Sequence, residues 1–497
     1  MNNLQQSNVV IIGGGPAGLG TALMLAKKGW TGITVLEKRP SADYYEPDKS
    51  FSYQIDGRGQ KLTDLLNLTP KLANLSVPST EFYFTLIKPD GNRKTSKLPI
   101  ADSNRKTAYW LPRATFVNLF YDEIERNWQN SIQVLFQTRC VEINLNSDSA
   151  SSATSATNSS QAKRLEIIAQ SQDEQQLTFT PNLLVGCDGL NSIVRQTLHN
   201  WEQGKSHDFE MQQFPSPSAG LKYKVLTVLP RFPLSETQED LAESTMAYGI
   251  RSTFKGRKKA ISLGLLPLKD PDIERTANII TYPDHHIWQL KTPEALGNYL
   301  TQAFPQLPLE KIISSEEITR FFFSNGGTFP LPQYCSRLYQ IWGQPDDNHG
   351  TAIILFGDAA HCFPPDIGQG VNSALEDVYL FSETLAEVED NLALALPRYQ
   401  NLRQPDIKAL IRLVQISYPW QYGQNLWQKR LWGLNFLLRL QLSRLFPFIF
   451  SPHSFLLIQN HELSYSEILA KSNRTTQFLY ILGALLVLIV LYIAFLK

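Results

Sequence analysis

The fold of this chain is decided by ten residues near its N-terminus, Val9-Val10-Ile11-Ile12-Gly13-Gly14-Gly15-Pro16-Ala17-Gly18. Four apolar residues that favour a β-strand run directly into the pattern Gly-x-Gly-x-x-Gly. In such a turn Gly13 permits the tight bend, Gly15 lets the backbone approach a pyrophosphate, and Gly18 lets the next helix pack close to the strand. The helix that begins there points free N–H groups at the anion. The stretch therefore predicts a dinucleotide-binding βαβ unit.

The residues that follow complete this unit. We expect a helix over Leu19–Lys28 and a second strand over Ile33–Leu36, which ends at Glu37. Glu37 lies 19 residues beyond the last glycine of the motif, where an acidic residue meets the ribose 2′-OH of an adenosine. The motif by itself leaves NAD, NADP and FAD open. The predicted cofactor contacts in this unit are Gly13, Gly15, Ala17, Gly18, Glu37 and Lys38.

Composition excludes several classes of protein. The 497 residues include 46 Lys and Arg and 46 Asp and Glu, so the formal charge is zero, and charge gives no reason to expect a nucleic-acid partner. The four cysteines are far apart in the sequence and form no Cys-x-x-Cys pair. We therefore predict no metal site and no disulfide framework, but reduced thiols in a cytosolic compartment.

The two ends of the chain differ in character. Met1–Asn8 is polar and is followed at once by the first core strand, so we expect no secretory signal. Phe478–Leu496 is a run of 19 residues without a charge, and as a helix it would span about 28 Å, close to the thickness of a bilayer's hydrocarbon core. It predicts a single C-terminal transmembrane helix. Lys471 and Arg474 precede it and only Lys497 follows, which favours a catalytic body on the cytoplasmic side.

Between these ends, the pattern of apolar residues predicts a second domain. From about residue 215 to 342, short apolar runs alternate with turns, as in an antiparallel sheet. Phe82–Ile87 and Leu98–Pro99-Ile100 predict a hairpin, and Ser50–Gly59 predicts a strand that enters a glycine-rich bend. Ser147–Gln161 lacks large apolar groups and predicts a flexible loop on a hairpin. Ala352–Phe356 again has the composition of a buried parallel strand, so the chain returns to the first domain.

Two further motifs follow predicted core strands at their carboxyl ends, the edge at which open α/β sheets bind ligands. One is Asp188-Gly189-Leu190-Asn191-Ser192-Ile193-Val194-Arg195. The other is Gly357-Asp358-Ala359-Ala360-His361-Cys362-Phe363-Pro364-Pro365-Asp366-Ile367-Gly368-Gln369-Gly370-Val371-Asn372. In this order and spacing the three motifs resemble those of the FAD-dependent aromatic-ring hydroxylases, the single-component flavoprotein monooxygenases. The kynurenine 3-monooxygenase branch is the most similar.

The resemblance implies a fold and a reaction. The fold is α/β, a Rossmann-like FAD-binding domain with an inserted antiparallel β-sheet substrate domain, a helical C-terminal region and the C-terminal transmembrane helix. In the reaction NAD(P)H reduces FAD, and O₂ then adds at the flavin C4a position. The resulting hydroperoxide hydroxylates an aromatic or otherwise hydrophobic small molecule. No second Gly-x-Gly-x-x-Gly occurs in the sequence, so NADPH or NADH is expected to bind only transiently.

The resemblance also implies residue roles. Asp358 follows a buried strand and precedes small residues, so its carboxylate can accept hydrogen bonds from ribitol hydroxyls. Gly368-Gln369-Gly370 opens a helix whose N–H groups can stabilise negative charge on a reduced flavin. The implied FAD contacts are Arg113, Asp188, Gly189, Asp358, Gly370, Val371 and Asn372. The implied catalytic residues are Pro365, Gly368, Gln369 and Gly370, and the implied substrate contacts are Tyr109, Asn372 and Tyr418.

One departure from the branch concerns the substrate. The branch holds its amino-acid carboxylate with an arginine on the strand before a glycine-containing turn, whereas Glu81–Ile87 has no arginine. The loss of a bidentate carboxylate partner at a buried site weakens binding by several kcal/mol. The resemblance therefore leaves open whether kynurenine itself is a substrate.

The implied domain boundaries and the open alternatives are as follows. The FAD-binding domain comprises 1–80, 105–214 and 346–400, the substrate domain 81–104 and 215–345, the helical region 401–472 and the anchor 478–496. Leu426–Phe450 is expected to cap the substrate cavity, with an amphipathic helix on the membrane surface as the alternative. A FAD-dependent prenyl-chain reductase, saturase or epoxidase and a non-catalytic membrane flavoprotein are the alternative functions.

Overall fold

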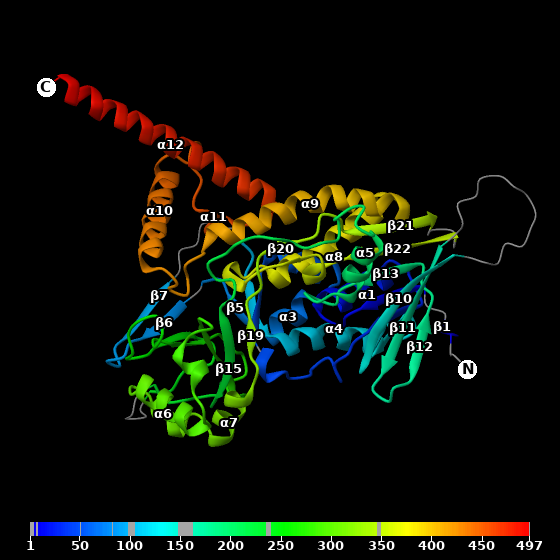
Figure 1. Ribbon diagram of the computed structural model, residues 1–497, viewed down its shortest axis with the longest axis horizontal. Coiled ribbons are helices and arrows are strands. Elements are labelled where there is room, and N and C mark those ends of the chain that lie inside the picture. Colours follow the sequence, from blue (N-terminus) through cyan, green and yellow to red (C-terminus); the bar gives the residue numbers. More distant parts are fainter. Residues whose placement is uncertain are drawn as a thin grey trace, which may run out of the picture.

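The computed structural model describes residues 4–5, 8–49, 51–81, 83–97, 105–147, 163–234, 240–344 and 349–496. Within these residues the chain forms a mixed α/β fold with two hydrophobic cores and a helical C-terminal region (Figure 1). The Ser/Ala/Thr tract that predicts a flexible loop lies, from residue 148 onward, outside the described residues.

The first core surrounds a six-stranded sheet with the strand order β21-β22-β13-β2-β3-β9. Five of the strands are parallel, and β21 runs antiparallel to β22 at one edge. All residues of β2, β3 and β13 are buried, as expected for apolar strands in the middle of a parallel sheet. The bounds are Tyr339–Gln344 (β21), His349–Leu355 (β22), Leu183–Gly186 (β13), Val9–Ile12 (β2), Ile33–Leu36 (β3) and Ile132–Leu135 (β9).

Helices and a smaller sheet cover this sheet. Helix α1 (Pro16–Lys27) contacts both α4 (Arg113–Asn127) and α8 (Gly370–Glu387), and α5 (Ile193–Trp201) follows β13. Proline suits the first position of α1, where the backbone N–H has no partner within the helix. A four-stranded sheet packs against β3 and β22. Its strands in spatial order are Leu4–Gln5 (β1), Gln176–Phe179 (β12), Lys163–Ser171 (β11) and Thr138–Ser147 (β10).

The second core lies under a seven-stranded sheet with the order β19-β15-β18-β17-β16-β6-β7. Its strands pair antiparallel except β16 and β6, which are parallel. Two helices that the sequence did not predict, α6 (Pro293–Ala303) and α7 (Ser315–Phe323), contribute to this core. The strands are Gly327–Thr328 (β19), Lys222–Val228 (β15), Arg275–Thr281 (β18), Ser262–Leu265 (β17), Ala247–Arg251 (β16), Tyr83–Ile87 (β6) and Arg93–Lys97 (β7).

The predicted hairpin is present with an earlier return strand, and one other local prediction is wrong. The hairpin returns through Arg93–Lys97, a polar edge strand that is exposed throughout, and the predicted return at Leu98–Ile100 lies outside the described residues. The expected glycine-rich bend after Ser52–Ile55 (β4) is the first turn of α2 (Gly57–Leu65). Asp56 caps this helix by accepting hydrogen bonds from the first free backbone N–H groups.

Two three-stranded sheets and a short helix join the larger layers. In one, β4 and Val77–Ser79 (β5) flank Ala108–Pro112 (β8), and α3 (Thr69–Leu75) leads into β5. In the other, Gln333–Tyr334 (β20) lies between two further strands. These are Gln212–Gln213 (β14) and His361–Cys362 (β23).

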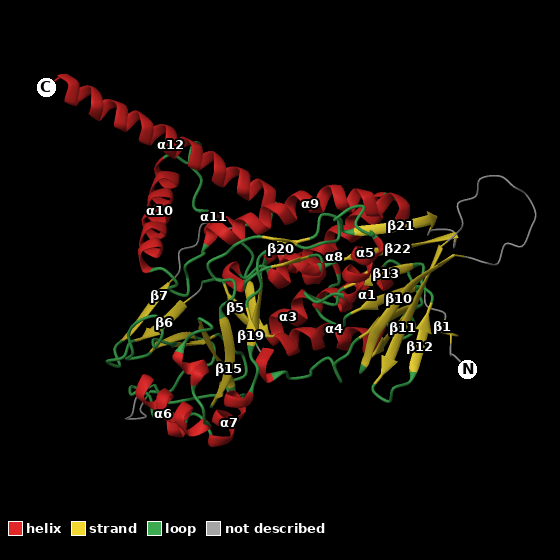
Figure 2. Cartoon of the chain, viewed as in Figure 1, coloured by secondary structure: helices red, strands yellow, loops and turns green. Residues whose placement is uncertain are grey.

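The C-terminal region is helical, as the sequence predicts (Figure 2). Helix α9 contains two prolines and packs against α8 and against the first part of α12. The last part of α12 extends away from the body (Figure 1). The helices are α8, α9 (Leu392–Ser417), α10 (Leu426–Leu445), α11 (Ser454–Leu457) and α12 (Tyr465–Leu496).

Helix α12 changes its surroundings along its length. Its first half buries Tyr465, Ile468, Ser472 and Thr475, and all residues from 480 to 496 are exposed. In the described part of the chain it is the one helix long and apolar enough to cross a membrane, by length and composition. The expectation that Leu426–Phe450 packs as a cap is wrong for most of α10, because Arg439 is the only residue of α10 that is buried.

Candidate active site

The three glycines of the first motif serve different neighbours. Gly13 has φ +105°, and a Cβ there would stand 2.4 Å from the carbonyl oxygen of Cys187. A Cβ on Gly18 would stand 1.9 Å from the carbonyl oxygen of Gly13. By contrast, no protein atom lies within 4 Å of the position a Cβ would take on Gly15. The fold itself therefore requires Gly13 and Gly18, whereas Gly15 faces open space.

Three other glycines at this edge of the sheet also face open space. A Cβ on Gly189, Gly368 or Gly370 would have no protein atom within 4 Å. With Gly15 we call them the open glycines. They follow β2, β13 and β22, which are neighbours in the sheet, so their segments begin at one carboxyl edge. At these glycines the backbone of three segments is uncovered by side chains, at the edge where open α/β sheets bind ligands. We call this uncovered backbone the cradle.

Glu37 holds the glycine turn. Its carboxylate is buried and accepts hydrogen bonds from the backbone N–H of Gly14 at 2.7 Å and of Arg39 at 2.8 Å. Lys38, by contrast, is exposed. Beside Glu37 is a small surface hollow, which Arg39 and Arg113 also line. Sequence reasoning missed Arg39, because nothing in the motif marks the second residue after the acid.

Asp188 caps the helix that follows it. Its Oδ2 accepts a hydrogen bond from the N–H of Ile193 at 2.6 Å, at the start of α5. Its Oδ1 is buried and, within the described residues, has no hydrogen-bond partner. Burial raises the pKa of the Asp188 carboxyl above its ordinary value. An unpaired buried acceptor costs about 1–3 kcal/mol, so Asp188 is suited to accept a hydrogen bond from a bound group.

Asp358 lies at the same edge, in the short turn that follows β22. Its side chain is exposed, yet the protein packed around it raises its pKa by desolvation, with the charges of His361 and Arg113 acting against the rise. Tyr53 on β4 lies within electrostatic range of both Arg113 and Asp358. Asp358 and Arg113 are therefore brought together from segments about 245 residues apart, as a ligand that contacts both would require.

The loop before α8 is held from beneath and open above. Pro365 and Gly368 are exposed, and Gly368 has φ +64°, a conformation that favours glycine. Gln369 is buried, where its Nε2 donates to Asp56 at 2.7 Å and its Oε1 accepts from the Tyr465 hydroxyl at 2.7 Å. The side chain of Gln369 thus points into the protein. What the loop presents outward is backbone, at the positive end of the α8 dipole.

Asn372 is fully used by the protein. Its Nδ2 donates to the carbonyl oxygens of Gln54 and Gly368 at 2.9 and 3.0 Å, and its Oδ1 accepts from the N–H of Asp56 at 3.0 Å. The side chain is 1% exposed. In this conformation Asn372 positions Gly368 and makes no contact with the open side of the loop. Its neighbour Val371 is half-buried in the first turn of α8.

The other two expected substrate contacts lie on different elements. Tyr109 is half-buried on β8, opposite Ile55 of β4. Tyr418 follows α9, and its ring centroid lies 4.7 Å from that of Trp432 and 5.2 Å from that of Phe455. Tyr418 thus belongs to an aromatic cluster between α9, α10 and α11.

Asp366, which the sequence reasoning did not single out, is a buried member of the loop before α8. Its carboxylate accepts hydrogen bonds from the Ser218 hydroxyl and, at 3.0 Å, from Nε2 of Gln421. Burial raises the pKa of Asp366 to about 6, and these hydrogen bonds limit the rise. Asp366 therefore connects the loop by hydrogen bonds to Ser218, just before β15, and to Gln421, in the segment after α9.

A buried ionic network fixes α8 below the loop. Nε of Arg403 lies 2.6 Å from Asp377, and its NH1 lies 2.9 Å from Glu376. NH1 of Arg58 lies 2.8 Å from Glu376, and Nε2 of His361 lies 2.8 Å from Asp377. Burial alone would raise the pKa of Glu376, but Arg58 and Arg403 hold it below its ordinary value. The network joins α2, α8, α9 and the loop after β22 into one rigid support.

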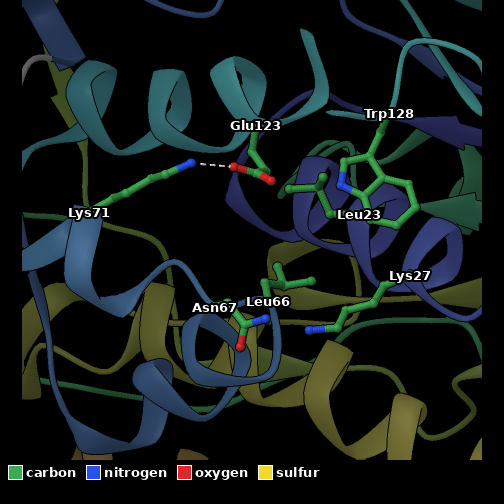
Figure 3. A pocket seen from close by; sticks show the side chains of 7 residues that line it. All are labelled: Leu23, Lys27, Leu66, Asn67, Lys71, Glu123 and Trp128. Carbon is green, nitrogen blue, oxygen red and sulfur yellow. Dashed lines mark hydrogen bonds and ion pairs between the residues drawn. The ribbon is translucent and has the colours of Figure 1, made fainter. Parts of the chain in front are cut away.

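Two features of the described residues concern other kinds of site. Among these residues no group of three or more His, Cys, Asp or Glu could hold a metal ion. A cavity of about 190 Å³ lies between α1, α3 and α4 and contains none of the expected site residues (Figure 3). Its lining includes an ion pair between Lys71 and Glu123 at 2.5 Å. The full lining is Leu23, Lys27, Leu66, Asn67, Lys71, Glu123 and Trp128.

Comparison with known proteins agrees with this geometry. Residues 6–224 and 346–414 match the family model described as "FAD binding domain". Kynurenine 3-monooxygenase of Salinispora tropica is 23% identical over 84% of this chain and 80% of its own length. Violacein synthase of Chromobacterium violaceum is 24% identical over 82% of this chain and 84% of its own length.

Solved structures share the fold. PqsL of Pseudomonas aeruginosa in complex with 2-aminobenzoylacetate has a TM-score of 0.53 at 17% identity and covers 86% of this chain and 99% of its own. The tetrameric form of 2-methyl-3-hydroxypyridine-5-carboxylic acid oxygenase has a TM-score of 0.52 at 15% identity and covers 83% of this chain and 91% of its own.

Proposed function

This chain belongs to the FAD binding domain family and is a FAD-dependent monooxygenase, and from that premise we propose that it uses NAD(P)H and O₂ to hydroxylate a hydrophobic, aromatic small molecule. The observation that carries the proposal is the cradle of open glycines at the carboxyl edge of the first sheet. Its bare backbone suits the close approach of a cofactor with a pyrophosphate, and two of its glycines, Gly368 and Gly370, belong to the segment that opens α8.

The residues at this edge fit FAD. We propose that the glycine turn and Glu37 bind the ADP half, with the adenosine in the hollow that Glu37 and Arg39 line. Asp358 accepts hydrogen bonds from the ribitol chain, and Oδ1 of Asp188 accepts from the cofactor the hydrogen bond that no protein donor supplies. Bound FAD supplies electron transfer from NAD(P)H and the activation of O₂.

The loop before α8 positions the reaction. The backbone N–H groups at the N-terminus of α8 stabilise negative charge that develops beside them. Gln369 keeps these groups in place through Asp56 and Tyr465, and Asn372 does the same through Gly368. We therefore propose that the side chains of Gln369 and Asn372 position the loop, and that Pro365 and the glycine backbone contact the reacting groups.

The substrate is proposed from the walls of the site. The strand that holds the substrate carboxylate in the kynurenine 3-monooxygenase branch corresponds to β6, which has no arginine, and the chain beyond the loop supplies the aromatic cluster around Tyr418. Such surroundings favour an aromatic ring and disfavour an amino-acid carboxylate. We propose Tyr109 and Tyr418 as substrate contacts.

The exposed half of α12 is proposed to anchor the enzyme. None of the most apolar 18-residue stretch of α12 is buried, and the basic residues Lys471 and Arg474 precede it. We propose that this half crosses a bilayer once and that the catalytic body faces the cytoplasm.

Anaerobic reduction of the bound flavin tests the proposed function. Purified holoprotein is mixed with NADPH or NADH in a stopped-flow instrument, with and without members of a panel of hydrophobic aromatic compounds. We expect at least one compound to accelerate the loss of oxidised-flavin absorbance and to be hydroxylated once O₂ is admitted. A protein that forms product without O₂, as a prenyl-chain reductase would, contradicts the proposal.

A further inference from the structure

Helix α10 presents an apolar face that the fold leaves uncovered. Trp427, Leu431, Leu434, Leu438 and Leu445 are 46–69% exposed. Their spacings of three, four and seven residues place them on one side of the helix. In the turn that follows, Phe448 is 93% exposed. A group of large exposed apolar side chains on one helix face marks an interaction site.

The charge around this face has one sign. Residues 407–461 contain no Asp or Glu, but six Lys and Arg. Arg430 and Arg444 are exposed on α10 itself. A helix with an apolar face bordered by basic residues is suited to the boundary between lipid headgroups and acyl chains, and most of all to anionic lipids.

Contacts with α12 fix the position of α10 along the axis of α12. Arg439 donates from NH2 to the Thr476 hydroxyl at 2.7 Å and from NH1 to the Ser472 carbonyl at 3.2 Å. The ring centroids of Phe450 and Phe478 are 6.2 Å apart. Helix α10 therefore meets α12 where the exposed apolar half of α12 begins, and Figure 1 shows one end of α10 near the middle of α12, with α10 running off at a large angle to it. With α12 upright in a bilayer, α10 lies along the surface of that bilayer.

We propose that the apolar face of α10 and the turn 446–450 lie in the surface of a bilayer that contains anionic lipids. The protein then meets the membrane at two places, the span and α10, and the body cannot rotate freely about α12. This inference rests on the proposed span of α12 and goes beyond the proposed function. A second copy of the chain is a poorer occupant, because two surfaces of the same positive charge repel each other.

Contacts of α10 connect it to the proposed active site. The inner side of α10 packs through Trp432 on Tyr418, and Gln421 in the same segment donates to Asp366 of the loop before α8. The membrane surface is thus one helix away from the proposed substrate contacts.

A nitroxide label on α10 of the full-length holoprotein tests the proposal. Leu434→Cys is labelled and reconstituted in phosphatidylcholine vesicles with or without phosphatidylserine. The matched control is Leu394→Cys, at the start of α9, since Leu394 and Leu434 are 60% and 65% exposed. Unsubstituted protein is labelled in parallel to measure the background from the native cysteines. This background is expected to be low, because three of the four are buried and Cys187 is half-buried. Power saturation in an EPR spectrometer then compares access of O₂, which concentrates in lipid, with access of a water-soluble nickel chelate.

We expect the ratio of O₂ access to nickel access to be higher at residue 434 than at residue 394, and to rise further with phosphatidylserine. Equal ratios at the two positions overturn the proposal, because α10 then lies in water. Exclusion of both reagents at residue 434, with dipolar broadening between labels, also overturns it, because a second copy then covers the face. Leu431→Cys repeats the test at a second position, and retained flavin absorbance shows that each labelled protein is folded.

Discussion

A pair of glycine substitutions separates what the first motif does for the fold from what it does for the cofactor. In Gly18→Ala the new methyl group stands 1.9 Å from the Gly13 carbonyl oxygen. Overpacking costs about 1–3 kcal/mol, and backbone cannot rotate away, so we expect the free energy of unfolding of the apoprotein to fall by about 3 kcal/mol. In Gly15→Ala the methyl group meets no protein atom within 4 Å, and φ is −79°, a value that alanine adopts readily.

For Gly15→Ala, therefore, we expect apoprotein stability within about 1 kcal/mol of the unsubstituted protein. The methyl group instead occupies the space that we propose for the pyrophosphate. The same 1–3 kcal/mol of overpacking then raises the dissociation constant of FAD roughly 5- to 150-fold. Urea unfolding of the apoproteins and titration with FAD, followed by flavin fluorescence, measure both quantities. The reasoning is refuted if Gly15→Ala binds FAD normally, or destabilises the apoprotein as much as Gly18→Ala does.

Three further predictions follow from the same geometry. Arg403→Met leaves two buried carboxylates short of a partner and is expected to lower the free energy of unfolding by about 3–5 kcal/mol. The control is Arg398→Met, whose ion pair has the same 2.6 Å distance but is exposed; it is expected to change the free energy of unfolding by under about 1 kcal/mol. Equal effects of the two substitutions in urea unfolding would contradict the role of burial. The pKa of Asp366 rises from 3.8 to about 6 on folding, so between these pH values the folded protein keeps a proton that the unfolded chain releases. The folded state therefore loses about 3 kcal/mol of stability as pH rises through this range. Asp366→Asn is expected to gain stability relative to the unsubstituted protein between pH 4 and pH 8, and a stability difference that stays constant across that range would contradict this prediction. Deletion of residues 478–497 is expected to leave a FAD-containing protein that binds phosphatidylserine vesicles at low salt. At 1 M salt, where charges are screened within about 3 Å, the truncated protein is expected to dissociate from the vesicles, whereas the full chain stays bound. A truncated protein that does not bind the vesicles at low salt would count against α10 as a membrane contact.

The central strands could be predicted to the residue. Val9–Ile12 and Ile33–Leu36 are where the sequence places them, because short continuous apolar runs suit a strand that is buried on both faces. Strand β7 was missed because it is the opposite case. Its residues are polar and exposed, and backbone hydrogen bonds to β6 hold it at the sheet edge.

The supports of the site could not be predicted from the motifs. Asp56 looks like part of a loop in the sequence, and only the packed structure places it beneath Gln369. Arg403 reaches two carboxylates that lie 26 and 27 residues earlier, and no local pattern marks such a pairing. The covering of Leu426–Phe450 was misjudged for a related reason: periodicity shows which side chains share a helix face, but not what lies against that face.

The most direct test of the central claim is the fate of molecular oxygen. Holoprotein, NAD(P)H and an aromatic compound that accelerates flavin reduction are incubated under ¹⁸O₂, and the product is analysed by mass spectrometry together with the NAD(P)H consumed. The account predicts one ¹⁸O atom in each molecule of product and one NAD(P)H oxidised for each hydroxylation in a fully coupled reaction. Product that carries no ¹⁸O, or that forms equally well without O₂, would contradict it.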